Sequence, residues 1–93
     1  MIVSFRDAET EKVFRGAFSR KLPQDIQQRA RRRLMQIHNA SSINDLRVPP
    51  SNRLESLVGD RSAYWSIRIN RQWRVVFGWK DGNASEVLIE DYH

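Results

Sequence analysis

AYWSIRIN, at residues 63–70, alternates apolar and polar side chains, and this period of two is typical of a β-strand that buries one face. WRVVFGW at 73–79 repeats the alternation, and VLIEDYH at 87–93 supplies a third strand. Asn70-Arg71 and Asp81-Gly82-Asn83 separate the strands, and Asp-Gly is a strong signal for a tight hairpin loop. These segments are therefore predicted to form an antiparallel meander.

The two faces of this predicted meander differ in chemistry. One face is apolar and is expected to lie against the core, whereas the other carries Arg68 and Arg74. The meander is thus predicted to be both the scaffold and the active surface, with the remainder of the chain covering its back. The expected core face holds Trp65, Ile67, Ile69, Trp73, Val75, Phe77 and Trp79.

The first two thirds of the chain predict two helices and two short strands. Residues 2–6 are a short strand candidate, and Asp7 is placed to cap a first helix. The clearest helix spans about residues 23–39, where apolar side chains recur every three or four positions. After a connector, residues 53–57 predict another short strand. The order β-α-α-β-β-β-β predicts an α+β fold, with both helices on one face of a small, mostly antiparallel sheet.

The composition fits one small basic domain, residues 1–93, and limits its chemistry. The absence of cysteine excludes disulfides and thiolate chemistry, and two histidines are too few for an all-histidine metal site. No apolar run is long enough to cross a membrane, so we expect a cytoplasmic protein. Separately, we expect it to use neither metal nor cofactor. The net charge of +5 favours nucleic acid, an anionic membrane or an acidic protein as partner.

Four arginines crowd five positions of the predicted second helix: Arg29, Arg31, Arg32 and Arg33. They are candidates for contact with the phosphates of RNA. Two other interpretations stay open, namely a solvated helix face and a docking surface for acidic residues of a partner protein.

The residues that offer catalysis are the arginines of the sheet and the C-terminal carboxylate, phenol and imidazole. Cleaving RNA without metal needs a base for the 2′-hydroxyl, cations for the phosphate and an acid for the leaving oxygen. His93 can serve as base or acid near neutral pH, Asp91 can orient it or act as base, and Tyr92 can stack on a base or hold a proton. Arg68 and Arg74 could clamp the scissile phosphate. The alternative is an ordinary strand end beside solubilising arginines.

Several segments together resemble the HigB branch of the RelE toxin superfamily. They are RLESL at 53–57, GDR at 59–61, YWSIRIN at 64–70, WRVVF at 73–77 and the final DYH at 91–93, and the opening strand and helix also fit. The resemblance implies a RelE-like microbial ribonuclease fold and the toxin of a type II toxin–antitoxin system. It implies an endoribonuclease that enters the ribosomal A site of the 30S subunit and cuts mRNA there without metal.

Particular residues take roles from this resemblance. Asp91, Tyr92 and His93 match the terminal catalytic motif, and Arg74 matches an arginine that contacts the scissile phosphate. Glu55 stands where characterised members can have a histidine, so it is either a base or a sign of a weak enzyme. In a regular strand Asp91 and His93 point to one face and Tyr92 to the other, so all three meet only where the strand bends.

The expected reaction is attack of the 2′-oxygen on the adjacent phosphate, which gives a 2′,3′-cyclic or 3′-phosphate and a 5′-hydroxyl. The implied partners are the ribosome, mRNA and a cognate HigA-like helix-turn-helix antitoxin, with no membrane and with DNA reached only through the antitoxin. Arg61 and the helix arginines are expected to bind RNA or the ribosome. The alternative is a weakly catalytic member that inhibits by binding the ribosome or acts as corepressor with its antitoxin.

Overall fold

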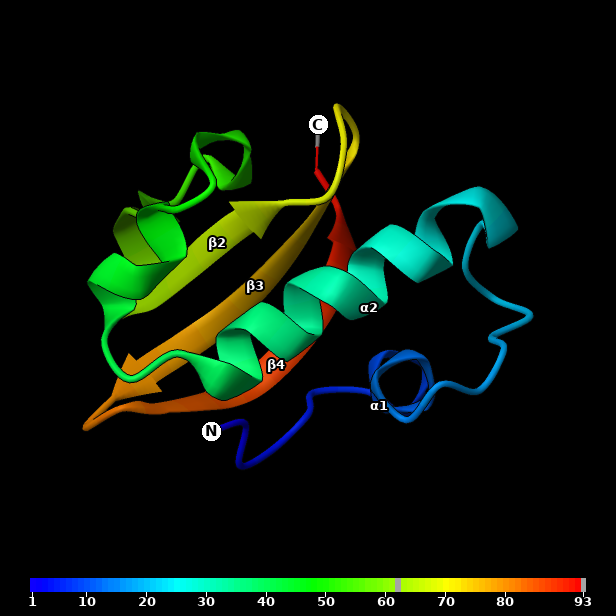
Figure 1. The fold of residues 1–93 in the computed structure, drawn as a ribbon, viewed down its shortest axis with the longest axis horizontal. Coiled ribbons are helices and arrows are strands. Elements are labelled where there is room, and N and C mark those ends of the chain that lie inside the picture. The colour runs from blue at the N-terminus through cyan, green and yellow to red at the C-terminus, as the bar shows by residue number, and fades with distance from the viewer. Residues whose placement is uncertain (62, 93) are drawn as a thin grey trace.

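A four-stranded antiparallel sheet forms the centre of the computed structural model, which describes residues 1–61 and 63–92. Two helices precede it, and the α+β class predicted from the sequence is confirmed. Figure 1 shows α2 lying across the sheet, and α2 contacts both β3 and β4. Three short 3₁₀ turns connect α2 to the meander. The regular elements are α1 (Ala8–Phe14), α2 (Gln24–Asn39), β1 (Glu55–Ser56), β2 (Tyr64–Arg68), β3 (Trp73–Lys80) and β4 (Asn83–Asp91), with strand order β1-β2-β3-β4.

The predicted apolar face of the meander is the face that meets the helices. Ile67, Val75 and Phe77 are completely buried, together with Leu34 and Ile37 of α2. The three tryptophans of the sheet are partly buried and pack against this cluster. Burying this apolar area is the main term that holds α2 on the sheet.

The predicted first strand at residues 2–6 is wrong as a regular strand. Ile2 and Phe5 form only isolated parallel bridges, to Ala84 and Val87 of β4. The cause lies in β4, where a bulge places Glu86 and Val87 opposite one residue of β3 and gives Glu86 a φ of 50°. A bulge interrupts the ladder that a regular strand needs, so the segment follows β4 without forming one. The observed order is therefore α-α-β-β-β-β.

Strand limits also differ from those predicted. The segment predicted as a strand at 53–57 shortens to Glu55–Ser56, since Arg53 has a φ of 46° and cannot join a ladder. β4 begins at Asn83, four positions before the predicted start, because Asp81 and Gly82 alone make the hairpin loop with φ of 54° and 79°. This is the two-residue loop that Asp-Gly predicts.

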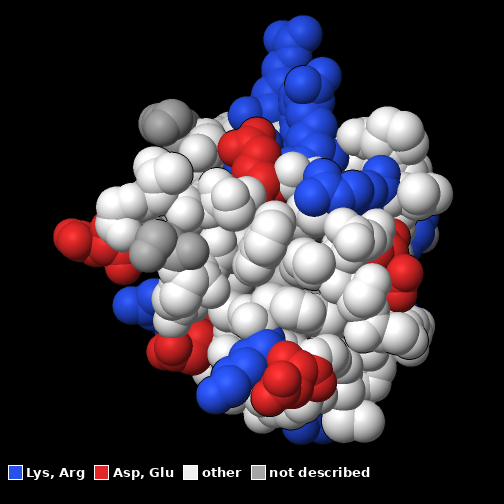
Figure 2. Space-filling model, turned by 90° about the vertical axis from the view of Figure 1, so that its left-hand side faces the viewer, with Lys and Arg blue, Asp and Glu red and all other residues white. Residues whose placement is uncertain are grey.

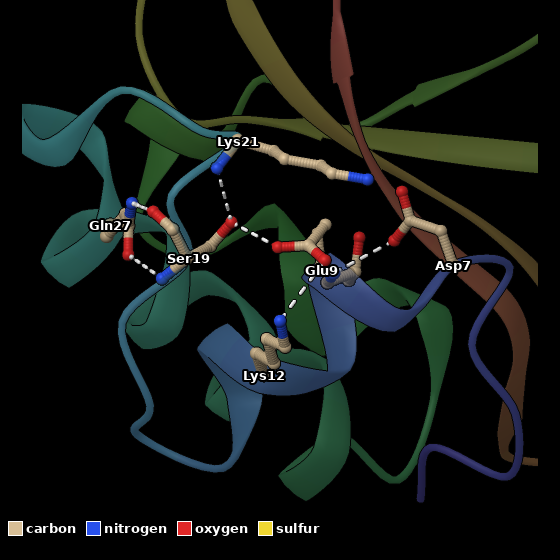
Figure 3. A network of polar contacts seen from close by, with 7 residues as sticks. Asp7, Glu9, Lys12, Ser19, Lys21 and Gln27 are labelled. Carbon is tan, nitrogen blue, oxygen red and sulfur yellow. Dashed lines mark hydrogen bonds and ion pairs between the residues drawn. The ribbon is translucent and has the colours of Figure 1, made fainter.

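Polar contacts tie the two helices together through the connector between them. Asp7 caps α1 as predicted, with its Oδ1 accepting the N–H of Thr10 at 2.8 Å. The buried Ser19 donates its hydroxyl to Glu9 Oε1 at 2.6 Å and accepts the N–H of Lys21 at 3.2 Å (Figure 3). The side-chain amide of Gln27 in α2 donates to and accepts from the main chain of Ser19, at 2.7 and 3.0 Å. The connector is thus fixed from both sides.

No described helix of this chain has the length and apolar content needed to cross a membrane.

We expect Ser19→Ala to destabilise the fold, and the loss should depend on pH. The Ser19 hydroxyl lowers the pKa of Glu9 below its ordinary 4.5. A carboxylate with a depressed folded-state pKa stabilises the fold above its unfolded pKa and loses that stabilisation as pH falls through the folded pKa. Urea unfolding should therefore show a larger difference between variant and wild type at neutral pH than in acid. Equal differences at both pH values would contradict the link to Glu9.

Candidate functional site

Arg74, on β3, lies on the polar face of the sheet and is only 7% exposed as a whole residue. Its Nη1 donates to Ser66 Oγ at 2.7 Å and to the carbonyl of Arg53 at 3.5 Å. Its Nη2 donates to Glu55 Oε1 at 3.0 Å in an ion pair. The ring of Tyr92 faces the same guanidinium, 4.9 Å from ring centroid to Cζ. A buried cation costs several kcal/mol unless it is paired in this way.

Strand register explains why these groups meet. Glu55 of β1 is the partner of Ser66 on β2, and Ser66 lies diagonally from Arg74 because Arg68 is the direct partner of Arg74. All of these residues belong to one face of the pleat. Tyr92 follows β4, and its N–H donates to the carbonyl of Gln72 at 2.5 Å.

An open cavity of about 400 Å³ adjoins this centre. It is lined by Glu55, Ser56, Leu57, Val58 and Tyr92, so two of the groups that contact Arg74 form part of its wall. A ligand in the cavity would meet a tyrosine ring, a carboxylate and, behind them, a guanidinium. That combination suits a phosphate linked to an aromatic base.

Of the two predicted C-terminal residues that the structure describes, Tyr92 lies against Arg74 and Asp91 does not. Asp91 is the register partner of Trp73, on the opposite face, and its Oδ2 accepts from the side-chain amide of Gln72 at 3.1 Å. This follows from alternation along β4. The predicted role of His93 lies outside the described residues.

Arg68 does not join Arg74, although the two are register partners. Its Nε donates to the carbonyl of Asn70 at 3.0 Å, which turns the side chain toward the β2–β3 turn. There it lines a second cavity, with Arg29 and Arg33 from α2. The predicted clamp of two arginines is therefore divided between two places.

The arginines of α2 do not form one face either. Arg29 and Arg33 donate to the carbonyls of Ile69 and Arg68 at 3.3 and 2.9 Å. Arg31 instead donates to the carbonyl of Phe14 at 3.2 Å, which places it against the end of α1. Arg31 and Arg32 both line a hollow on α2 that is separate from the cavity of Arg29 and Arg33. The backbone of Arg61 ends a 3₁₀ turn, and its side chain is not among those described.

Ser66 and Arg53 contribute to the site although no role was predicted for them. Ser66 is completely buried, and its position on the same strand face as Arg68 was a signal that it would point toward the arginines. The contribution of Arg53 comes from its backbone carbonyl in a left-handed conformation, which no sequence pattern indicated. Among the described residues, no cluster of three or more histidine, aspartate or glutamate side chains could hold a metal ion.

A nearly buried arginine under a tyrosine ring, on the sheet of a small basic α+β protein, is an arrangement suited to binding phosphate groups. Comparison with known proteins gives the family. A family model described as the RelE-like toxin of type II toxin–antitoxin system HigB matches residues 3–93. The chain therefore belongs to the family of HigB-like toxins, as its motifs indicated.

Two relatives align with the chain from end to end. Toxin HigB-1 of Vibrio cholerae is 33% identical over 93 residues, covering 99% of this chain and 98% of that protein. Endoribonuclease HigB of Proteus vulgaris is also 33% identical over 93 residues and covers the whole of both chains.

We expect Ser66→Ala to lower the free energy of unfolding by about 1–3 kcal/mol, because it removes a hydrogen-bond partner from the buried Arg74 guanidinium. Urea unfolding measures the effect. Ser56→Ala is the matched control, since Ser56 is an exposed serine on the neighbouring strand. Equal stability of the two variants would contradict the assigned role of the Ser66 hydroxyl.

Proposed function

We propose that this chain is the toxin of a type II toxin–antitoxin system, and that it cleaves mRNA in the A site of the 30S ribosomal subunit without metal. Family membership, the activity named for the Proteus relative and the phosphate-suited centre at Arg74 support this. The fold is proposed to be RelE-like, of the microbial ribonuclease type. The observation that carries the proposal is the buried guanidinium of Arg74, placed beside Tyr92 at the wall of an open cavity.

The proposed reaction is a transfer within the RNA chain. The 2′-oxygen attacks phosphorus and the bond to the 5′-oxygen breaks, so the products are a 2′,3′-cyclic phosphate and a 5′-hydroxyl. Water can then open the cyclic phosphate at its bond to the 2′-oxygen, which gives the 3′-phosphate. Negative charge grows on the phosphate oxygens, and a preorganised guanidinium stabilises that charge. Arg74 is assigned this role. His93 is assigned to take and return the proton, because Asp91 lies on the opposite face from Arg74 and is left as the weaker candidate for this role. Tyr92 stacks on a base or donates to the leaving oxygen.

Glu55 is proposed to be the counter-ion that substrate replaces. Its carboxylate pairs with Arg74, yet its side chain is 49% exposed, whereas the Arg74 side chain is 9% exposed. A phosphate oxygen can accept the same Nη2 hydrogen after the carboxylate rotates toward solvent. The Arg74 guanidinium then has an anionic partner both before and after RNA binds. We therefore assign Glu55 primarily the role of counter-ion and only secondarily that of proton acceptor.

The proposed setting is the cytoplasm, where a HigA-like helix-turn-helix antitoxin neutralises the toxin and carries it to DNA. Arg61, Arg31 and Arg32 are assigned to the RNA of the ribosome, and Arg29 and Arg33 are assigned to RNA binding more generally.

The Glu55–Arg74 pair also favours a second candidate function, in which the protein inhibits translation by binding alone or acts as corepressor with its antitoxin. A carboxylate already occupies the guanidinium that cleavage would need. Growth arrest without new mRNA 5′ ends, persisting in Arg74→Ala, would support this second function.

We expect Arg74→Lys to reduce mRNA cutting about 10²–10³-fold, because an ammonium cannot replace the guanidinium fork at the phosphate. Primer extension on translated mRNA maps the new 5′ ends, and His93→Ala should lose them too. Arg20→Lys is the control, since Arg20 is exposed and lies in the connector between the helices. The same cut pattern in all four proteins, or none in the wild type, would refute the assignment.

We expect Glu55→Gln to lower the KM for ribosome-bound mRNA about fivefold, since removing a negative charge next to the phosphate is worth about 1 kcal/mol in water. Steady-state cleavage rates supply kcat and KM separately, with Glu11→Gln on α1 as control. A fall of kcat by about 10² or more would instead identify Glu55 as a base.

A further inference from the structure

A cavity at the β2–β3 turn is separate from the one beside Tyr92. It has a volume of about 490 Å³. Four parts of the chain contribute to it: α2, the segment after the second 3₁₀ turn, the end of β2 and the turn itself. Its polar wall consists mainly of Arg29, Arg33, Arg53, Arg68 and Arg71, with Asn70. We call these six residues the arginine pocket.

Main-chain carbonyls hold three of these guanidinium groups in place. Arg29 donates to the carbonyl of Ile69, Arg33 to that of Arg68, and Arg68 to that of Asn70. Each of these hydrogen bonds uses one of the five N–H donors of an arginine. Because these hydrogen bonds hold the guanidinium groups in place, the remaining N–H donors are already positioned. A ligand that binds them would therefore cost little side-chain conformational entropy.

No described carboxylate balances the charge in the arginine pocket. No acidic residue is among the described residues that line it, and no ion pair joins its arginines to a described carboxylate. Burial lowers the pKa of Arg33, and the charges of Arg29 and Arg32 lower it further, which marks the mutual repulsion. Figure 2 shows Lys and Arg side chains gathered at the top of the view, and the β2–β3 turn lies at the top of Figure 1. An anion would relieve this repulsion.

Arg53 connects the arginine pocket to the candidate catalytic centre. Its carbonyl accepts from Arg74, while the residue also lines the pocket. Two residues further along the chain, Glu55 lines the cavity beside Tyr92. The two cavities are therefore neighbours along one short segment, and a single extended strand with charges at regular intervals could reach both.

We propose that the arginine pocket binds a backbone phosphate of the same RNA strand whose scissile phosphate lies at Arg74. This rests on the proposed function, because it assumes that RNA lies at Arg74. Phosphate suits the pocket because its oxygens accept from several guanidinium groups at once, and bidentate pairing with arginine is strong. The second phosphate fixes the strand so that the scissile linkage meets Arg74 and Tyr92. Sequence is not read in the pocket, since backbone contacts carry no base information.

The test measures binding of single-stranded RNA whose 2′-hydroxyls are methylated, which prevents cleavage. The pocket variant is Arg29→Gln with Arg33→Gln, and the matched control is Arg6→Gln with Arg20→Gln, which removes the same charge from two exposed positions outside α2. Dissociation constants are taken for a hexanucleotide and for a dinucleotide with one phosphate, at several KCl concentrations. If the double pocket variant unfolds in a thermal melt, Arg71→Gln in the exposed turn replaces it.

The pocket variant should bind the hexanucleotide about tenfold or more weakly than the control, and should bind the dinucleotide equally well. The slope of log K against log salt should fall by about 0.7 for each phosphate that the variant no longer neutralises. Equal losses of affinity in the pocket and control variants, or wild type that binds no RNA, would overturn the proposal. So would normal RNA binding with lost binding of a polyglutamate peptide, which would assign the pocket to an acidic protein partner.

Cleavage measured in parallel separates this proposal from the proposed function. If wild type cuts mRNA while the pocket variant binds RNA normally, the arginine pocket assignment fails and the endoribonuclease assignment stands. If the pocket variant loses hexanucleotide binding although wild type cuts nothing, the pocket assignment stands and the endoribonuclease assignment fails.

Discussion

The guanidinium of Arg74 is the constraint on which this site depends, because a nearly buried cation must have partners at fixed positions. Those partners come from four separate places: the carboxylate of Glu55 on β1, the hydroxyl of Ser66 on β2, the carbonyl of Arg53 and the ring of Tyr92 after β4. A register slip of one residue would send every one of these strand residues to the other face of the sheet. The strand register that places apolar side chains against α2 therefore also places the polar site on the opposite face of the sheet.

Alternation and turn chemistry were enough to predict the meander, its apolar face and the Asp81-Gly82 hairpin, because these depend on local periods and on φ preferences. The site was predicted less completely, since alternation assigns a side chain to a face and leaves its direction along that face open. Arg68 shows this, because it shares the face of Arg74 but bends to the carbonyl of Asn70. The prediction of a strand at residues 2–6 was wrong because it depends on the bulge at Glu86 in β4, and nothing in the sequence of residues 2–6 indicates that bulge.

The two arginine groups differ in how their charge is balanced, and the difference suits two tasks. Arg74 is buried, paired with Glu55 and covered by a ring, so it is held rigidly and presents few donors in a defined direction. The arginine pocket is open, anchored only by carbonyls and without a described counter-ion, so it presents many donors to any phosphate that arrives. A rigid, neutralised cation serves a chemical step, whereas an unbalanced group of cations supplies affinity and on-rate.

In the RNA-free protein, the negative charge of Glu55 stabilises the nearly buried Arg74 better than a positive or neutral side chain at this position would. Without its carboxylate, the described partners of Arg74 would be a hydroxyl, a carbonyl and a ring, and no described carboxylate would compensate the charge in this nearly buried position. With it, RNA bound as proposed would exchange one anion for another at the same guanidinium, and the local charge would change little. The cost would be competition, because the phosphate must displace a carboxylate whose side chain is half exposed. The neighbouring arginine pocket has no described carboxylate to displace, so under the same proposal its attraction would offset that competition and draw the strand toward Arg74.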